Sequence, residues 1–328
     1  MNKEITKTLI KRILSSFLVL FLMITFLFFL LRISPGSPYQ KFVSPELSPK
    51  LSSLVRESFN LNSSLADQYK SFIVNLVQGN FGISYTYRIP VIEVIKKYLP
   101  FTLIFSLISF IIQLSIGFLL ALISVKKING FLDNSISKTG LALYSIPSFV
   151  IGVTLIFIFS DWLNIFPSSG LSSFDFSSYT LIGKLTDYTV HMILPLITLS
   201  LAGIIVFYKY MRDNIVEVYN KTFIENLRMH GLTEKEIARK HVIPNAISPL
   251  ISVAGVELGL LFGGALITEV IFSLPGMGRL TVNAILSRDY PLVVGCTFTA
   301  GILVIITNLA ADLIKAKLDK RLVKGIIN

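Results

Sequence analysis

The sequence predicts an all-α polytopic membrane protein with six transmembrane helices, a small extracytoplasmic helical cap and a polar cytoplasmic loop. Composition supports this fold class, because 53% of the 328 residues are hydrophobic and 15% are charged, against about 25% charged residues in a typical soluble domain. A bilayer-spanning helix needs about 20 mainly apolar residues, and six segments reach that length. They are residues 13–31, 100–125, 136–160, 191–210, 249–272 and 291–314.

The distribution of Lys and Arg predicts the orientation of these helices, since short cytoplasmic segments carry an excess of both residues. With the N-terminus inside, the cytoplasmic segments hold 19 of the 30 Lys and Arg. These segments are 1–12, 126–138, 209–248 and 315–328. Both termini are therefore expected in the cytoplasm. The segment 13–31 is expected to be retained as a helix, because it is too long for the hydrophobic part of a signal peptide and lacks an A-x-A-like cleavage site.

The chain is expected to divide into five parts. They are a cytoplasmic N-terminus (1–12), the first transmembrane helix (13–31), the cap (32–99), a five-helix core with a polar loop at about 211–248 (100–314) and a cytoplasmic tail (315–328).

The cap, residues 32–99, is expected to be helical and to lie on the outer face. Pro35, Gly36 and Pro38 end the first transmembrane helix. Apolar residues at helical spacing predict two helices, one over 51–59 and one over 65–76. Val91, Ile92 and Ile95 predict a third, short amphipathic helix. It leads to Pro100, which suits the first turn of the next transmembrane helix.

The polar loop between the fourth and fifth apolar segments is predicted to form two short helices separated by a sharp turn. Gly231 is placed to end the first helix, because a left-handed residue after a helix needs no Cβ. Thr233 and Glu236 have the spacing of a capping box, which begins the second helix. Pro244 either stops that helix or marks the beginning of the next transmembrane segment.

This loop resembles the cytoplasmic EAA loop of permease subunits in bacterial ABC importers. Glu225 and Gly231 are six residues apart and Ile243 and Pro244 follow, as in the family pattern, although the two alanines of that pattern are replaced by Asn and Leu. Other stretches resemble the dipeptide/oligopeptide/nickel branch of the family. They are S-P-G-S-P at 34–38, F-G-I-S-Y at 81–85, P-S-F at 147–149, L-P-G-M-G-R-L at 274–280, A-I-L-S-R-D-Y-P at 284–291 and L-D-K-R-L at 318–322. The resemblance covers about residues 9–322.

The resemblance implies that the first loop helix is a coupling helix, which docks in a groove of an ATPase subunit. The residues it assigns to this contact are the apolar anchors Phe223, Ile224 and Leu227, the rim charges Glu225 and Arg228, and the turn residue Gly231. It also implies two ATPase subunits that bind ATP and magnesium, a second homologous permease that completes a heterodimer of twelve transmembrane helices, and an extracytoplasmic substrate-binding protein. The location implied is the bacterial cytoplasmic membrane. The alternative for this basic loop is that it lies on anionic lipid.

No motif for chemistry occurs in the chain itself. The sequence lacks a G-x-x-x-x-G-K-[ST] loop, an H-E-x-x-H pair and a G-x-S-x-G turn. We therefore expect no enzyme activity, no cofactor and no metal site in this chain, and ATP to be bound by partner subunits. The net charge of +11 could indicate nucleic acid, but the basic residues lie beside apolar segments. The single cysteine, Cys296, lies in an apolar stretch and excludes an intramolecular disulfide.

Carboxylates within apolar segments are candidates for the translocation pathway, since a charge at membrane depth is costly and usually faces a cavity or a partner. Glu257 is either a pore group or an interhelical hydrogen-bonding group. Glu269 either lines the pathway or pairs with Arg279 or Arg288. We expect the following stretch, with Pro275, Gly276, Gly278 and Arg279, to be an irregular loop at the outer mouth.

Glycines 255, 259 and 263 lie on one face of the fifth transmembrane segment. Such small faces allow close helix packing, for which a second permease subunit is a candidate partner.

The function predicted is a transmembrane permease subunit of an ATP-driven, binding-protein-dependent importer, with peptides as substrate. A nickel or metal-chelate importer is the alternative within the same family. An ion-coupled secondary transporter, with Glu257 and Glu269 as proton or cation sites, is a more distant one. Copurification of ATPase subunits distinguishes the importer from the secondary transporter.

Overall fold

The computed structural model describes residues 3–33, 64–263 and 265–318. The regular structure in these ranges is helical, and they contain no β-strand beyond one isolated bridge between Ile83 and Pro90. The expected all-α fold class is therefore confirmed. The predicted helix over 51–59 and the break at 35–38 lie outside the described residues.

Five long helices form the body of the molecule. They are α1 (Lys3–Ile33), α4 (Val91–Ser124), α7 (Leu181–Tyr219), α10 (Ile243–Phe262) and α13 (Tyr290–Leu318). The shorter helices are α3 (Leu65–Val77), α5 (Phe131–Tyr144), α6 (Ser148–Leu155), α8 (Thr222–Met229), α9 (Glu234–Ile237), α11 (Leu266–Ile271) and α12 (Met277–Leu286). π-helical turns follow α6 over Ile156–Trp162 and join α9 to α10 over Ala238–Val242.

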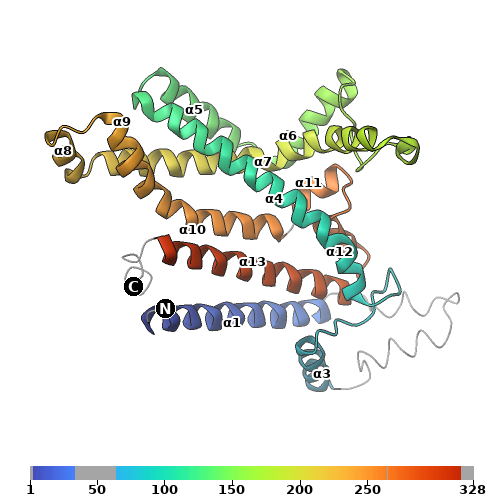
Figure 1. Ribbon diagram of the computed structural model, residues 1–328. Coiled ribbons are helices and arrows are strands. Elements are labelled where there is room, and N and C mark those ends of the chain that lie inside the picture. Colours follow the sequence, from blue (N-terminus) through green and yellow to red (C-terminus); the bar gives the residue numbers. More distant parts are fainter. Residues whose placement is uncertain (1–2, 34–63, 264, 319–328) are drawn as a thin grey trace.

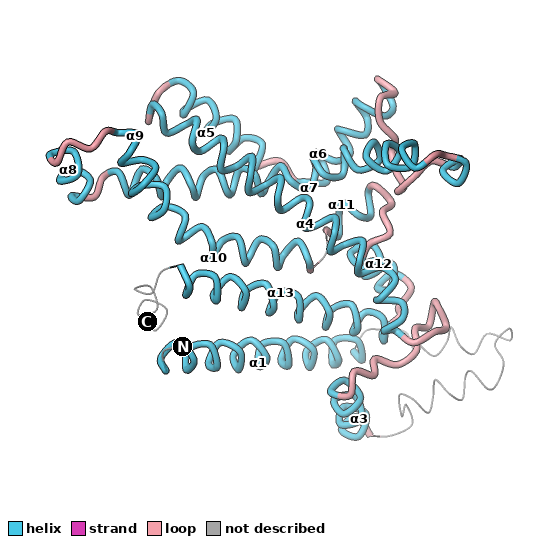
Figure 2. The backbone as a smooth tube through the Cα atoms, viewed as in Figure 1, coloured by secondary structure: helices cyan, strands magenta, loops and turns pink. Residues whose placement is uncertain are grey.

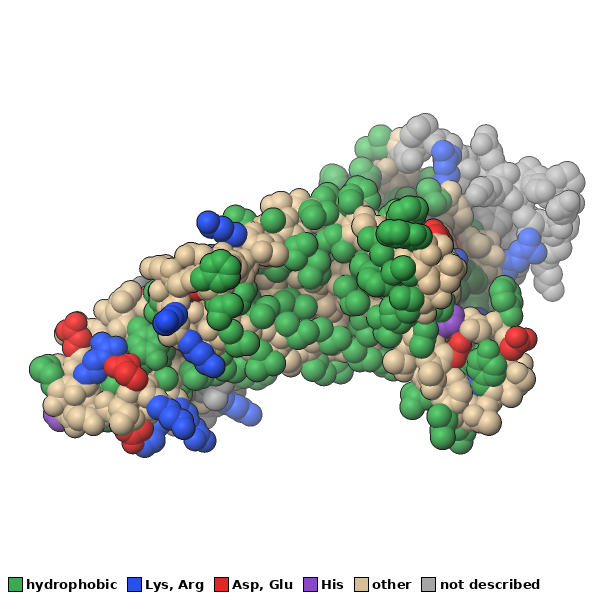
Figure 3. Space-filling model, turned by 90° about the horizontal axis from the view of Figure 1, so that it is seen from above, with side chains coloured by type: hydrophobic (Ala, Val, Ile, Leu, Met, Phe, Trp, Pro, Cys, Tyr) green, Lys and Arg blue, Asp and Glu red, His purple; other side chains and the backbone are tan. Residues whose placement is uncertain are grey.

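The elements gather at two ends of the long helices (Figure 1). We call the α8 end the one that holds α8, α9, the α4–α5 turn, the beginning of α1 and the end of α13. The α12 end holds α3, α11, α12 and the segment after α6. Between them lies a broad apolar band, and Lys and Arg side chains gather at the α8 end (Figure 3). Five helices are long and apolar enough to cross a membrane, or up to six if the bent pair α5–α6 forms one span.

The prediction of one continuous transmembrane helix over 136–160 is wrong, because two helices occupy this segment. Helices α5 and α6 are bent by 94° at the short break between Tyr144 and Ser148. Pro147 explains the break, because the residue before a proline is disfavoured in the α conformation. The fifth predicted segment, 249–272, is also interrupted, between α10 and α11.

The second transmembrane helix begins earlier than predicted. We expected a separate short helix ahead of Pro100, but α4 runs continuously from Val91 to Ser124 with Pro100 inside it. Pro100 removes one backbone donor. The first turns are nevertheless held, because Val91, Val94 and Ile95 are each 1% exposed and pack in one apolar cluster with α12 and α13. Tertiary burial therefore overrides the local proline signal.

Helix α3 confirms the predicted cap helix over 65–76 and lies against α1. The Tyr69 hydroxyl is 2.8 Å from Thr25 Oγ1 on α1. The rings of Tyr69 and Phe72 also contact Phe28, with centroid separations of 5.4 and 4.9 Å. The cap is thus attached to the first transmembrane helix at the α12 end.

Small residues bring the long helices close together. A Cβ on Gly117 of α4 would lie 2.8 Å from the carbonyl oxygen of Ile204 on α7. Gly259 of α10 similarly lies against Thr307 and Val304 of α13, and Gly255 lies against the same helix. Small interfacial residues are typical of membrane helix pairs. At Gly255 and Gly259 the glycine face of α10 therefore packs on α13 of the same chain, and the suggestion that these positions face a second subunit is corrected.

Candidate functional site

The turn between α8 and α9 has the geometry that its sequence predicts. Gly231 has φ +81°, and its N–H donates to the carbonyl of Arg228 at 2.9 Å. The next N–H, of Leu232, donates to the carbonyl of Leu227 at 3.2 Å. These two bonds form a Schellman motif, which closes the end of α8 and reverses the chain. Figure 2 shows this short loop between the two helices at the α8 end.

Helix α9 begins with the predicted capping box. The Glu236 N–H donates to Thr233 Oγ1 at 3.3 Å, and the Thr233 N–H donates to the Glu236 carboxylate at 3.1 Å. Pro244 does not end this helix. It lies at the beginning of α10, just after the π turn Ala238–Val242. The polar loop therefore leads back into the apolar band without a second reversal.

Helix α8 is anchored to the helical core chiefly by the side chain of Ile224. Ile224 is 0% exposed and packs with Met211 and Ile215 of α7, Ile237 of α9 and Val242. Leu227 is partly buried against the same cluster. We expected both residues to insert into a partner's groove. The structure corrects this for Ile224, because its position in the helix points it into its own chain.

The outward side of α8 carries a different set of residues. Phe223 is 38% exposed and Met229 is 76% exposed. Glu225 is also exposed, and Arg228 Nε donates to Glu234 Oε1 at 2.6 Å across the turn. Met229, the last residue of α8, was missing from the sequence-based set, because its exposure becomes visible only in the structure. The exposed surface that α8 offers is thus a mixed apolar and charged one.

At the α12 end, Glu269 is fully buried and caps α12. Thr102 Oγ1 on α4 donates to its Oε1 at 2.9 Å, and the Arg279 N–H donates to its Oε2 at 3.0 Å. The Thr102 hydroxyl also accepts the Met277 N–H at 2.7 Å. A carboxylate at a helix N-terminus is favoured by the helix dipole. Glu269 does not pair with the Arg279 guanidinium, which donates instead to the Ser273 carbonyl at 2.5 Å.

The L-P-G-M-G-R-L stretch is more regular than predicted. Leu274, Pro275 and Gly276 precede the helix, and α12 already includes Gly278 and Arg279. Both glycines are needed for close approach: a Cβ on Gly278 would lie 2.7 Å from the Cα of Leu266, and a Cβ on Gly276 would overlap the Glu269 carboxyl group. The expected irregular loop is therefore corrected to a short link with a buried, capped helix.

Two sequence stretches that resemble the family meet at this end. Ser84, from F-G-I-S-Y, donates through Oγ to Asp289 Oδ2 at 2.5 Å, and the Thr86 N–H donates to the same oxygen at 2.9 Å. Asp289, from S-R-D-Y-P, is 0% exposed. Sequence reasoning singled out both stretches but not this bond, because some 200 residues separate its partners.

A cleft of about 1160 Å³ also opens at the α12 end, between the segment after α6 and the beginning of α7. Its walls include Ser173, Asp187 and His191. The Ser173 N–H donates to Asp187 Oδ2 at 2.9 Å, and His191 Nδ1 lies 2.8 Å from the Asp187 carbonyl. Among the described residues, no group of three or more His, Cys, Asp or Glu could hold a metal ion.

Comparison with known proteins identifies the family. Residues 113–324 match the model of the binding-protein-dependent transport system inner membrane component, and residues 5–106 match the model of its N-terminal region. The chain belongs to this family. The resemblance noted in the sequence is thereby confirmed. It makes the chain a multi-pass membrane permease component of an ABC importer.

Curated relatives cover nearly the whole permease. It is 31% identical over 315 residues to the oligopeptide transport system permease protein AppB of Bacillus subtilis, which covers 96% of this chain and 98% of that protein. It is 31% identical over 320 residues to the nickel import system permease protein NikB of Staphylococcus aureus. That alignment covers 97% of this chain and 92% of NikB. A solved structure of the methionine ABC transporter MetNI, in inward-facing conformations, matches with a TM-score of 0.48 at 20% identity, covering 70% of this chain and 96% of that chain.

Glu257 differs from the other buried acids of the permease. It lies on α10 two residues from both Gly255 and Gly259, and therefore about 200° around the helix from the face that packs on α13. Its side chain is half-buried, and no hydrogen bond joins its carboxylate to any residue in the described part of the chain. The neighbouring Val256 and Leu260 are 50% and 60% exposed. Among the described residues, Glu257 is thus the acidic pathway candidate without a hydrogen-bond partner.

Proposed function

We propose that this chain is the permease subunit of an ATP-driven peptide importer, and that α8 is its coupling helix. The observation that carries the proposal is the end-to-end similarity to peptide permeases, combined with an α8 that is anchored inward by Ile224 and offers Phe223 and Met229 outward. A nickel importer is the second candidate, because NikB is as similar as AppB in identity.

Coupling follows from how α8 is attached. Only Asn220 and Lys221 separate it from α7, a helix of 39 residues that extends about 58 Å at 1.5 Å per residue. Ile224 packs with residues of both α7 and the beginning of α10. A partner that pushes on α8 therefore pushes on two long helices together. The ATPase would supply this force when it binds and hydrolyses ATP with magnesium.

The partners follow from the same proposal. The α8 end lies in the cytoplasm, where two ATPase subunits bind the coupling helices of this permease and of a second, homologous permease. The α12 end faces the binding protein, which delivers substrate beside the cleft at Asp187 and His191. The clustering of Lys and Arg at the α8 end supports this orientation in a bacterial inner membrane. Lipid surrounds the apolar band.

The experiment replaces Gly231 by Val in the complete transporter. The position has open space but a φ of +81°, so a β-branched residue strains the turn without creating a clash. Uptake should fall while the permease still reaches the membrane. Gly79→Val is the matched control, because Gly79 has φ +73° and equally open space at the α12 end.

Retention of ATPase subunits separates the two variants. Gly231→Val should weaken their attachment or their coupling to uptake, and Gly79→Val should leave their attachment unchanged. Normal uptake together with normal ATPase attachment in Gly231→Val would overturn the role of α8.

A further inference from the structure

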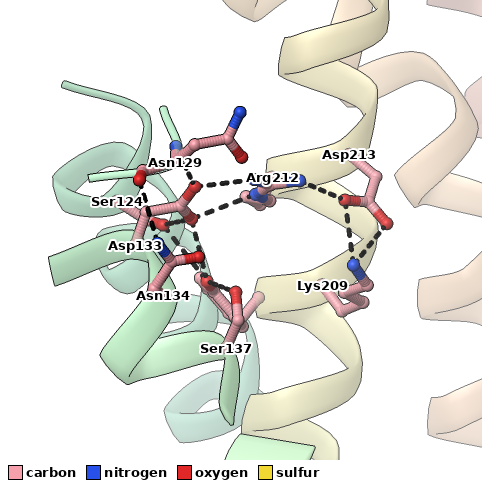
Figure 4. A network of polar contacts seen from close by, with 9 residues as sticks. Ser124, Asn129, Asp133, Asn134, Ser137, Lys209, Arg212 and Asp213 are labelled. Carbon is pink, nitrogen blue, oxygen red and sulfur yellow. Dashed lines mark hydrogen bonds and ion pairs between the residues drawn. The ribbon is translucent and has the colours of Figure 1, made fainter. Parts of the chain in front are cut away.

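A buried ion pair ties the α4–α5 turn to α7 at the α8 end (Figure 4). Asp133, in the first turn of α5, has a side chain that is 1% exposed, and Arg212 of α7 has one that is 16% exposed. Arg212 Nε donates to Oδ1 at 3.1 Å and Nη2 donates to Oδ2 at 2.6 Å. Two parallel bonds of this kind fix the relative orientation of the groups as well as their distance.

The same carboxylate also holds the end of α4 and the turn after it. The Ser124 hydroxyl donates to Oδ1, and the Asn129 N–H donates to Oδ2 at 2.8 Å. One turn earlier on α7, the Tyr208 hydroxyl lies 2.8 Å from Ser137 Oγ and 3.1 Å from Ser124 Oγ. Three elements that are separate in sequence are therefore joined by one polar network.

The network lies on α7 directly before the coupling helix. Arg212 is ten residues before the beginning of α8. Its sequence neighbour Met211 is 0% exposed and packs in the cluster that holds Ile224. Arg212 Nη1 also donates to Asp213 Oδ1 at 3.0 Å, and Lys209 pairs with Asp213. Helix α7 thus carries α8 on its apolar side and the α4–α5 turn on its polar side.

From Asp133, the α5–α6 pair follows α7 toward the α12 end. A Cβ on Gly140 of α5 would lie 3.5 Å from Ile205 of α7. A Cβ on Gly152 of α6 would lie 3.2 Å from Thr198 of α7 and 3.5 Å from the ring of Phe272, beside α11. The contact between Asp133 and Arg212, at the beginning of α5, is therefore a polar link that resists movement of α7 relative to this pair.

We propose that Asp133 and Arg212 are positioning residues for transport, which fasten the α5–α6 pair to α7 so that a displacement of α8 moves both toward the α12 end as one body. The inference rests on the proposed function of α8. Within it, the polar network determines how much of the ATPase movement reaches the pathway. The exposed pair Glu217–Lys221 lies nearer to α8 but joins residues of one segment, with side chains 68% and 50% exposed, and contributes little to such fastening.

The test measures substrate transported per ATP hydrolysed by the complete transporter in proteoliposomes. Asp133→Asn should assemble and hydrolyse ATP, but transport per ATP should fall by about fivefold or more, the lower end of typical coupling between sites. Arg212→Lys keeps the positive charge but cannot form the two parallel bonds. Its transport per ATP should fall less than that of Asp133→Asn. Glu217→Gln, the control, should match the unmodified transporter.

Tyr208→Phe keeps the test decisive if Asp133→Asn does not assemble. It removes only the hydroxyl that joins α7 to Ser124 and Ser137, and it leaves no charge unpaired. Reduced transport per ATP in Tyr208→Phe supports the inference. Transport per ATP equal to that of Glu217→Gln in every variant that assembles overturns it, as does an equal fall of ATP hydrolysis and transport. Absence of ATP-driven uptake in the unmodified transporter would instead contradict the proposed function itself.

Discussion

Asp133 at the α8 end and Glu269 at the α12 end are both buried carboxylates, 1% and 0% exposed, and each joins α4 to another element. Their charges are balanced differently. Asp133 faces the guanidinium of Arg212, whereas Glu269 faces backbone N–H groups at the beginning of α12 and the Thr102 hydroxyl. An ion pair joins two separate side chains, while a helix cap holds one short element in place. The difference is that the side chain of Asp133 joins α5 to α7 through an ion pair, whereas Glu269 holds the beginning of α12 through a helix cap.

Asp133→Ala should have the largest effect on stability. It leaves the Arg212 guanidinium, the Asn129 N–H and the Ser124 hydroxyl without their shared acceptor, and breaking a buried pair in this way costs about 3 kcal/mol. Thermal unfolding of the purified transporter measures the loss. Asp213→Ala, which removes an acid on α7 whose side chain is 46% exposed, should change stability by less than about 0.5 kcal/mol. Equal losses of stability in Asp133→Ala and Asp213→Ala would contradict the distinction between the buried ion pair and the exposed one.

Glu269→Gln should have a smaller effect, about 1–2 kcal/mol. The amide keeps the shape and can still accept from Thr102, but its NH₂ group meets the Arg279 N–H and loses a charge-assisted bond. The same unfolding measurement checks it. If Glu269→Gln were neutral, the α12 end would not depend on a charged cap, and the comparison of the two ends would fail.

Glu257→Gln should have almost no effect on either stability or uptake, because the half-buried carboxylate has no hydrogen-bond partner in the described part of its own chain. Uptake into proteoliposomes is measured with ATP supplied and the proton gradient collapsed. Glu257→Leu should reduce uptake more than Glu257→Gln, because it removes all polar capacity from the position. Uptake that requires the gradient and disappears in Glu257→Gln would favour an ion-coupled transporter.

The assignment of the two ends to the two sides of the membrane can be checked without any loss of function. In a Cys296→Ala background, Ser177→Cys at the α12 end should react with an impermeant thiol reagent in intact cells, and Lys235→Cys on α9 should not. Both positions are exposed, so accessibility within the protein is matched. The reverse labelling would place α8 outside the cell and away from ATP.

Local signals in the sequence were sufficient for the turn after α8. Gly231 and the pair Thr233–Glu236 act over a few residues, and each adopts the predicted geometry. The inward direction of Ile224 and the continuity of α4 through Pro100 depend on packing against distant helices, so local patterns misplaced them. The bond between Asp133 and Arg212 joins residues 79 positions apart. Neither residue has a local motif that marks it.

The most direct test of the central claim compares two positions of α8 by cysteine crosslinking to the ATPase subunit in the assembled transporter. Met229 is 76% exposed and Ile224 is 0% exposed on the same eight-residue helix. In the Cys296→Ala background, Met229→Cys should crosslink to the ATPase subunit and Ile224→Cys should not. Crosslinking through Ile224→Cys alone, or through neither position while the ATPase remains bound, would contradict the account of α8 as a helix anchored inward and docked outward.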